Sequence, residues 1–311
     1  MKAARGRILV TPRSLTAAPE DTRRRLEQAG FEVVLCTAGH TPSEAELLRL
    51  LPGCAGWIAG IEPVSERVLR AAAGLRAISR NGAGTDNLPL ATAAELGIAV
   101  LRAPGANARG VAELAIGLML ASLRAIPTQS ADLRRGAWQR RPGGEIGGRV
   151  VGVVGCGAVG RYVINGCRGL GARVLGFDPF PSFAPPDGFA WRGLDALLAE
   201  CDIVSLHCPP PSDGRPLLDA QRIAQLRPGC HLINTARAGL VDELALLAAL
   251  ESGHVAGYAT DVFPVEPPPP SKLLAHERVI ATPHVGGFTA ESVRAAADAA
   301  VDNLLSALTA A

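Results

Sequence analysis

Short apolar runs alternate with helical patterns along the first hundred residues. Four runs have the length and composition of buried strands: residues 7–11, 31–36, 56–59 and 75–79. Residues 19–29 repeat apolar positions at helical spacing and stop at Gly30, and the segment from Thr41 to Glu44 carries the capping residues of another helix. The alternation predicts a parallel sheet with helices on both faces.

A second alternation begins near Arg149. Its strand-like runs cover residues 149–155, 173–177, 202–207, 230–233, 254–260 and 279–281. Residues 159–170 form a helical pattern that Gly171 ends. The C-terminal segment from Thr289 is helical in pattern and no strand follows it, so we expect this helix to return to the first domain.

The segment of residues 107–126 is apolar almost all round, which predicts a buried helix that connects two domains. At 311 residues the chain has the length of about two domains. We therefore expect an α/β protein with two doubly wound parallel sheets. Residues 1–101 and 287–311 form a discontinuous domain in this interpretation, and residues 102–286 form the second.

Composition excludes several classes of protein. The net charge is only +2 and no long basic run occurs, so we expect no nucleic-acid partner. No apolar stretch reaches the length of a membrane span, and the basic N-terminus precedes too short an apolar run for a signal peptide. Seven cysteines without a C-x-x-C pair indicate reduced thiols in a cytoplasmic protein, and we expect no metal site.

A glycine-rich turn follows the first strand of the second half. Gly155, Gly157 and Gly160 form G-x-G-x-x-G between a strand and a helix, where backbone N–H groups and the helix N-terminus can bind a pyrophosphate. Asp178 ends the next strand, where a carboxylate accepts ribose hydroxyls and repels a 2′-phosphate. The pattern favours NAD over NADP, although Arg161 is a residue type that can hold a 2′-phosphate.

Polar residues follow the later strands, at the edge where ligands of open α/β sheets bind. They are Asn234, Thr235 and Arg237, then Asp261 and Glu266, then Thr282 and His284. An arginine, a carboxylate and a histidine are therefore expected to converge where a nicotinamide would lie. The other histidines have no comparable setting, and we interpret them as surface or structural residues: His40, His207, His231, His254 and His276.

Several segments resemble the D-isomer-specific 2-hydroxyacid dehydrogenases. They are VGVVGCGAVGR, NTARAGLVDE, ATDVFPVEP, TPHVGG and the earlier SRNGAGTDNL. The resemblance extends through nearly the whole chain, and it implies a Rossmann NAD-binding domain inserted into a flavodoxin-like catalytic domain. It also implies a homodimer, to which the apolar segment of residues 107–126 would contribute.

The resemblance implies a role for each site residue. Arg237 would bind the substrate carboxylate through two parallel hydrogen bonds. His284 would exchange the proton of the 2-hydroxyl group, and Glu266 would orient the imidazole and stabilise its protonated form. Asp261 would contact the cofactor near its nicotinamide end. Further cofactor contacts are implied at Gly155, Gly157, Ala158, Val159, Gly160, Asp178, His207, Cys208, Pro209, Thr235, Ala236 and Gly286, and substrate contacts at Asn81, Gly82, Ala83 and Gly84.

Departures from the family pattern narrow the substrate. Relatives that oxidise 3-phosphoglycerate carry an arginine where this chain has Ala59, and Glu62 nearby would repel a phosphate. Glu266 argues against the formate-oxidising branch, which has glutamine there. We therefore expect a small, unphosphorylated 2-hydroxy or 2-keto acid. The alternatives are a 3-phosphoglycerate dehydrogenase, an NAD(H)-sensing protein like the corepressors of this fold, and a hydrolase of the adenosylhomocysteine type.

Overall fold

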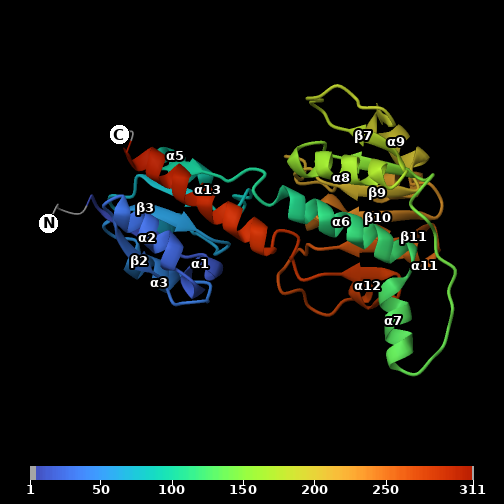
Figure 1. The fold of residues 1–311 in the computed structure, drawn as a ribbon, viewed down its shortest axis with the longest axis horizontal. Helices are drawn as coiled ribbons and strands as arrows, with labels where there is room; N and C mark the ends of the chain where they lie inside the picture. The colour runs from blue at the N-terminus through green and yellow to red at the C-terminus, as the bar shows by residue number, and fades with distance from the viewer. Residues whose placement is uncertain (1–4, 310–311) are drawn as a thin grey trace. The chain divides into compact units, whose positions relative to one another are not determined.

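The computed structural model describes residues 5–309, which divide into two compact units. Unit 1 contains the chain up to Asn107 and again from Thr289, and unit 2 contains Ala108–Phe288 (Figure 1). Both boundaries lie slightly later than expected. The loop after residue 101 stays with unit 1 because Asn303 Nδ2 donates to the Arg102 carbonyl at 2.8 Å.

Unit 1 is built on a five-stranded parallel sheet in the order β2-β1-β3-β4-β5. The strands are β1 (Arg7–Val10), β2 (Glu32–Leu35), β3 (Cys54–Ala59), β4 (Ala77–Arg80) and β5 (Ala99–Leu101). The helices are α1 (Arg13–Ala17), α2 (Glu20–Gln28), α3 (Glu44–Leu50), α4 (Glu66–Ala71), α5 (Leu90–Glu95) and α13 (Ala290–Thr309). This strand order is that of the flavodoxin-like fold, as expected.

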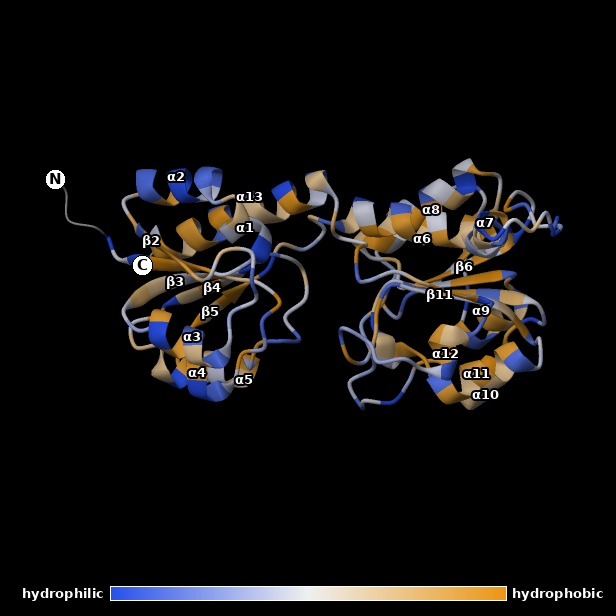
Figure 2. Ribbon diagram, turned by 90° about the horizontal axis from the view of Figure 1, so that it is seen from below, coloured by the Kyte–Doolittle hydropathy of each residue, from blue (hydrophilic) through white to orange (hydrophobic). Residues whose placement is uncertain are grey.

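Alternation along the strands separates the two cores of unit 1. Leu9, Trp57 and Ile78 point to the face covered by α3, α4 and α5. Their chain neighbours Ile8 and Ile58 point to the opposite face, where α1, α2 and α13 pack (Figure 2). A strand with apolar residues on both faces must be covered on both sides, and the C-terminal helix completes one of these layers.

Unit 2 is built on a seven-stranded parallel sheet in the order β12-β11-β10-β9-β6-β7-β8. The strands are β6 (Val150–Val154), β7 (Arg173–Phe177), β8 (Phe189–Trp191), β9 (Ile203–Leu206), β10 (Cys230–Asn234), β11 (Val255–Thr260) and β12 (Val279–Ala281). The helices are α6 (Ala108–Leu123), α7 (Ile126–Arg134), α8 (Ala158–Gly169), α9 (Leu194–Glu200), α10 (Ala220–Gln225), the 3-10 turn η1 (Ala238–Leu240), α11 (Glu243–Glu251) and α12 (Lys272–Ala275).

The strand order of unit 2 reverses direction at β6, which is the doubly wound Rossmann arrangement. Helices α6 and α8 cover one face of the sheet, and α9 to α12 cover the other (Figure 2). The expectation of two doubly wound parallel sheets, one of them a Rossmann domain inserted into a flavodoxin-like domain, is confirmed.

The expected helix of residues 107–126 is corrected in two respects. It buries one face rather than its whole circumference, and it ends at Leu123. Ala125 takes a left-handed φ of 46° and α7 starts anew at Ile126. Pro127 explains the break because its ring cannot follow the carbonyl of residue 123 in a continuous helix. The Gly144 N–H takes up that free carbonyl at 2.9 Å.

Within residues 5–309, no single helix combines the length and hydropathy needed to span a membrane. Helices α6 and α7 pass the same criterion only when they are joined across a bend of 63°.

Candidate active site

The glycine-rich turn joins β6 to the N-terminus of α8. Gly155 has a φ of 89°, and a Cβ there would lie 2.6 Å from the His207 carbonyl. A Cβ on Gly160 would lie 2.1 Å from the Gly155 oxygen, whereas one on Gly157 would meet nothing within 4 Å. Two of the glycines are therefore required by packing, and the third leaves open space before the first helical residues, Ala158 and Val159.

Asp178 follows β7 beside this turn. Its carboxylate accepts hydrogen bonds from the N–H groups of Cys156 and Phe180, both at 2.9 Å. These contacts hold the carboxylate next to the helix N-terminus, where ribose hydroxyls of a dinucleotide would be expected. Arg161 is engaged nearby, because its guanidinium donates to Ser182 at 2.8 Å and lies 5.0 Å from the Phe183 ring centre.

Two buried polar atoms at the carboxyl edge have no hydrogen-bond partner among the described residues. They are Thr235 Oγ1 and His207 Nδ1, which follow the paired strands β10 and β9. His207 Nε2 lies 2.8 Å from Ser205 Oγ, and burial lowers the pKa of this imidazole to about 3. Buried polar groups are nearly always hydrogen-bonded, so this edge fits a ligand that carries polar groups, as NAD does.

Cys208 follows His207 at the same edge. Burial raises the pKa of its thiol to about 11, so the thiol stays protonated and is a poor nucleophile. Pro209 is the exposed residue next to it. The described residues contain no cluster of His, Cys, Asp and Glu that could hold a metal ion.

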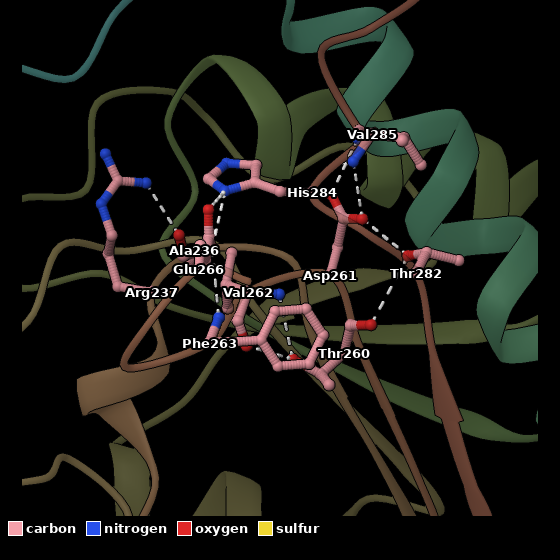
Figure 3. A network of polar contacts seen from close by, with 11 residues as sticks. Ala236, Arg237, Thr260, Asp261, Val262, Phe263, Glu266, Thr282, His284 and Val285 are labelled. Carbon is pink, nitrogen blue, oxygen red and sulfur yellow. Dashed lines mark hydrogen bonds and ion pairs between the residues drawn. The ribbon is translucent and has the colours of Figure 1, made fainter. Parts of the chain in front are cut away.

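Glu266 and His284, in the loops that follow β11 and β12, form a pair. The imidazole Nδ1 lies 2.8 Å from both oxygens of the Glu266 carboxylate (Figure 3). A carboxylate only accepts, so Nδ1 carries the proton and Nε2 is the nitrogen left for a substrate. The side chains keep 38% and 52% of their surface exposed, which leaves the imidazole accessible.

Arg237 lies after β10, on the loop next to this pair. Its Nη1 donates to the Ala236 carbonyl at 2.7 Å. The loop is held by the fully buried side chain of Asn234, which accepts from the Ala236 N–H at 3.1 Å and donates to the Arg237 carbonyl at 2.9 Å. Figure 3 shows Arg237 and His284 projecting from the same edge of unit 2.

Asp261 is almost fully buried, with 2% of its surface exposed. Its carboxylate accepts hydrogen bonds from Thr282 Oγ1 at 2.6 Å, the Val285 N–H at 2.8 Å and the Gly286 N–H at 2.7 Å. These partners surround His284 in the chain. The sequence placed Asp261 and Thr282 at strand ends, but it gave no signal that they contact each other.

The expected substrate segment, Asn81 to Gly84, lies in unit 1 after β4. The Asn81 N–H donates to the Ala59 carbonyl at 2.9 Å, and Gly82 takes a φ of 145°. The structure thus brings Arg237, Glu266 and His284 together on one edge of unit 2, and it places this segment on the carboxyl edge of the other sheet.

The fold and these edges define a two-domain α/β protein with a dinucleotide-binding domain. Residues 116–286 match the family model described as the NAD-binding domain of D-isomer specific 2-hydroxyacid dehydrogenases. The chain belongs to this family.

Relatives and solved structures agree with that assignment. The chain is 36% identical over 275 residues to D-3-phosphoglycerate dehydrogenase of Homo sapiens, which covers 87% of this chain and 51% of the relative. It therefore spans about half the length of such curated relatives. The TT0316 protein of Thermus thermophilus superposes with a TM-score of 0.88 at 34% identity, covering 98% of this chain and 97% of that one. NAD+-bound 3-phosphoglycerate dehydrogenase of Entamoeba histolytica superposes with a TM-score of 0.82 at 28% sequence identity, and the match covers 98% of this chain and 95% of that one.

Proposed function

We propose that the protein is an NAD-dependent oxidoreductase that interconverts a small D-2-hydroxy acid and its 2-keto acid. The observation that carries the proposal is the His284–Glu266 pair, with both carboxylate oxygens 2.8 Å from Nδ1, beside Arg237. Such a pair can hold a proton at Nε2 and return it, which is the acid–base work that this reaction requires.

His284 is the acid and base in this mechanism. In the reducing direction the imidazolium Nε2–H donates its proton to the 2-keto oxygen. In the oxidising direction the neutral Nε2 accepts the proton of the 2-hydroxyl group. Glu266 accepts from Nδ1 throughout, so it keeps the ring oriented and stabilises the imidazolium.

Arg237 binds the substrate carboxylate and orients C2. A guanidinium can donate two parallel hydrogen bonds to a carboxylate, which a lysine ammonium cannot do. Its positive charge also favours the negative charge that develops on the neighbouring oxygen during reduction. The Asn234 side chain fixes the loop from which this guanidinium extends.

NAD, when bound, supplies the hydride acceptor or, as NADH, the hydride donor. The turn from Gly155 to Gly160 would hold its pyrophosphate, and Asp178 would accept its ribose hydroxyls. His207 Nδ1 and Thr235 Oγ1, which have no hydrogen-bond partner among the described residues, would form hydrogen bonds with the cofactor. The carboxylate of Asp178 at this position favours NAD over NADP.

The substrate is proposed to lack a phosphate. At the carboxyl edge between β1 and β3, the Glu62 carboxylate accepts from Thr11 Oγ1 and from the Gly60 N–H. In the order β2-β1-β3, the strand order reverses direction between β1 and β3. Ligands of such folds bind at the carboxyl edge of the sheet where this reversal occurs. A buried carboxylate there, with Ala59 beside it, disfavours a phosphate. The alternative of 3-phosphoglycerate rests on the names of the curated relatives.

We also propose a homodimer in the cytoplasm. Ile126, Leu133 and Trp138 expose 52%, 57% and 81% of their surface on and after α7, which is typical of a surface that a partner covers. The described cysteines are all free thiols, which suits a reducing compartment. Light scattering at micromolar concentration is expected to show a dimer, and a monomer would contradict this part of the proposal.

The experiment that tests the activity is NADH oxidation, followed by absorbance, against 2-keto acids with and without a phosphate. We expect turnover of an unphosphorylated acid, faster with NADH than with NADPH. Arg237→Lys and His284→Asn should abolish most of it, while His40→Asn, at an exposed histidine, should not change it. Tight NADH binding without any turnover would favour the sensing protein instead.

A further inference from the structure

The backbone of His284 has an unusual conformation. Its φ is 52°, and among the described residues the only other residue with a positive φ that is not glycine is Ala125. A side chain with a Cβ adopts this left-handed region rarely, and it persists only where surrounding contacts impose it. The direction of the imidazole follows from this backbone, so the contacts that impose it bear on the proposed proton transfer.

The contacts after His284 come from Asp261. Its buried carboxylate accepts the N–H groups of the next two residues, Val285 at 2.8 Å and Gly286 at 2.7 Å. Hydrogen bonds to an ionised acceptor are shorter and stronger than those between neutral groups. A Cβ on Gly286 would lie 3.0 Å from Asp261 Oδ2, so the glycine lets the carboxylate approach its amide.

The contact before His284 comes from Thr282. Its hydroxyl lies 2.6 Å from Asp261 Oδ1 and 3.5 Å from the Thr260 carbonyl, and the single proton therefore goes to the carboxylate. The Thr282 N–H is fixed to the Thr260 carbonyl at 3.0 Å, and the Thr282 carbonyl accepts the His284 N–H at 2.9 Å. One carboxylate thus holds the chain on both sides of the histidine (Figure 3).

We propose that Asp261 and Thr282 are positioning residues that impose the left-handed backbone of His284 and thereby aim its imidazole at Glu266. The inference rests on the proposed function, in which His284 transfers the proton. It gives Asp261 a role beyond the cofactor contact that the family resemblance implies. Three donors already occupy its carboxylate within the protein.

Thr282 is a better residue to substitute than Asp261, because the family resemblance also implies a cofactor contact for Asp261. The Thr282 hydroxyl contributes one of the three hydrogen bonds to the Asp261 carboxylate. Thr282→Val removes the donor at nearly constant shape, and Thr282→Ser retains it. We expect the valine variant to lower kcat for keto-acid reduction at least about tenfold. The serine variant should stay within about threefold of the natural protein, and the Kd for NADH, from fluorescence, should change less than about twofold in both.

A double-substitution cycle separates positioning from general damage to the fold. Asn tolerates the left-handed region well, so His284→Asn removes the proton transfer while it preserves the backbone. In that background Thr282→Val should have no further effect on kcat, because its effect passes through the imidazole. An equal loss in both backgrounds would show a merely structural role and overturn the proposal.

Amide hydrogen exchange tests the hydrogen bonds to the Asp261 carboxylate without cofactor or substrate. We expect the Val285 and Gly286 amides to be protected in the natural protein and in Thr282→Ser, and to exchange at least about tenfold faster in Thr282→Val. Free exchange in the natural protein would overturn the proposal, as would equal protection in both variants. Failure of the proposed function is distinct, because the natural protein itself would then turn over no keto acid.

Discussion

Both oxygens of the Glu266 carboxylate lie 2.8 Å from the same ring nitrogen of His284. A carboxylate centred on one N–H stabilises the protonated ring and fixes its plane. The nitrogen that remains, Nε2, is then committed to one direction, which is the condition for repeated proton transfer to the same substrate atom.

Glu266→Gln is expected to lower kcat for keto-acid reduction roughly 100-fold at neutral pH. Reduction requires the imidazolium, which the neutral amide no longer stabilises. Oxidation requires the neutral ring, so its kcat should fall less. Steady-state kinetics in both directions at neutral pH measure the two losses, and an equal loss of kcat in both directions would contradict the assigned role.

Asp178→Asn is expected to improve the use of NADPH relative to NADH by roughly 10- to 100-fold in kcat/KM, because a charge that repels the 2′-phosphate is removed. Arg161, whose guanidinium donates to Ser182 at 2.8 Å, is the cation that we expect to bind the 2′-phosphate. Addition of Arg161→Gln should cancel most of the gain. An unchanged cofactor ratio in the single variant would show that Asp178 does not face the ribose.

Glu62→Gln is expected to raise the ratio of kcat/KM for phosphorylated over unphosphorylated hydroxypyruvate by roughly tenfold, the effect of one nearby charge. The glutamine oxygen can still accept from the Gly60 N–H, which the carboxylate accepts at 2.9 Å. Glu66→Gln, at an exposed position of α4, is the matched control and should leave the ratio unchanged. A natural protein that already prefers the phosphorylated acid would refute the assignment of substrate.

Asn234→Asp is expected to raise KM for the keto acid roughly 10- to 100-fold with a smaller effect on kcat, because the bond that steadies the Arg237 carbonyl is lost. That bond is 2.9 Å long and fully buried. The exposed Asn165, changed in the same way, provides the control. If kcat fell while KM stayed constant, the loop would not act through substrate binding.

The buried imidazole of His231 is expected to make the free energy of unfolding of unit 2 depend on pH. Its Nδ1 lies 2.7 Å from Ser122 Oγ, and burial with nearby Arg149 lowers the pKa of the ring to about 4. Below the ordinary pKa of about 6.5 the unfolded chain binds a proton that the folded chain does not. As the pH is lowered from about 6.5 to 4, the free energy of unfolding therefore decreases by about 1.4 kcal/mol per pH unit.

His231→Asn should remove this share of the pH dependence, and His40→Asn, at an exposed histidine, should not. Urea unfolding between pH 7.5 and 5, followed by circular dichroism, measures the difference. Parallel dependence on pH in the natural protein and in His231→Asn would show that the imidazole is not kept neutral by the fold.

The site elements that could be predicted from sequence are those with short-range signals. The glycine-rich turn and Asp178 follow directly on strands, and Arg237 and His284 each lie three residues after a strand. Contacts between loops could not be predicted in the same way. Asp261 meets the Gly286 amide across 25 residues of chain, at 2.7 Å, and this pairing depends on the alignment of β11 with β12.

Among the helices and strands, too, those with a local sequence signal could be predicted. The strand at Val279–Ala281 is confirmed with its expected bounds, because a short β-rich run between polar segments is a local signal. The break before α7 was not predicted, although Pro127 is a local signal for it. The partner of the freed Leu123 carbonyl, the Gly144 N–H, lies in a later loop and has no signal in the sequence around residue 123. Local patterns thus determine the elements, and long-range contacts determine which groups satisfy their ends.

The order of strands in unit 2 also sets the distance between the two ends of the cofactor site. Asp178 follows β7 and Glu266 follows β11, and the intervening order is β6, β9 and β10. Four steps at about 4.8 Å separate the two ends by about 19 Å. A mononucleotide that occupies one end cannot reach the other, so the width of the sheet selects a two-nucleotide cofactor before any side chain discriminates.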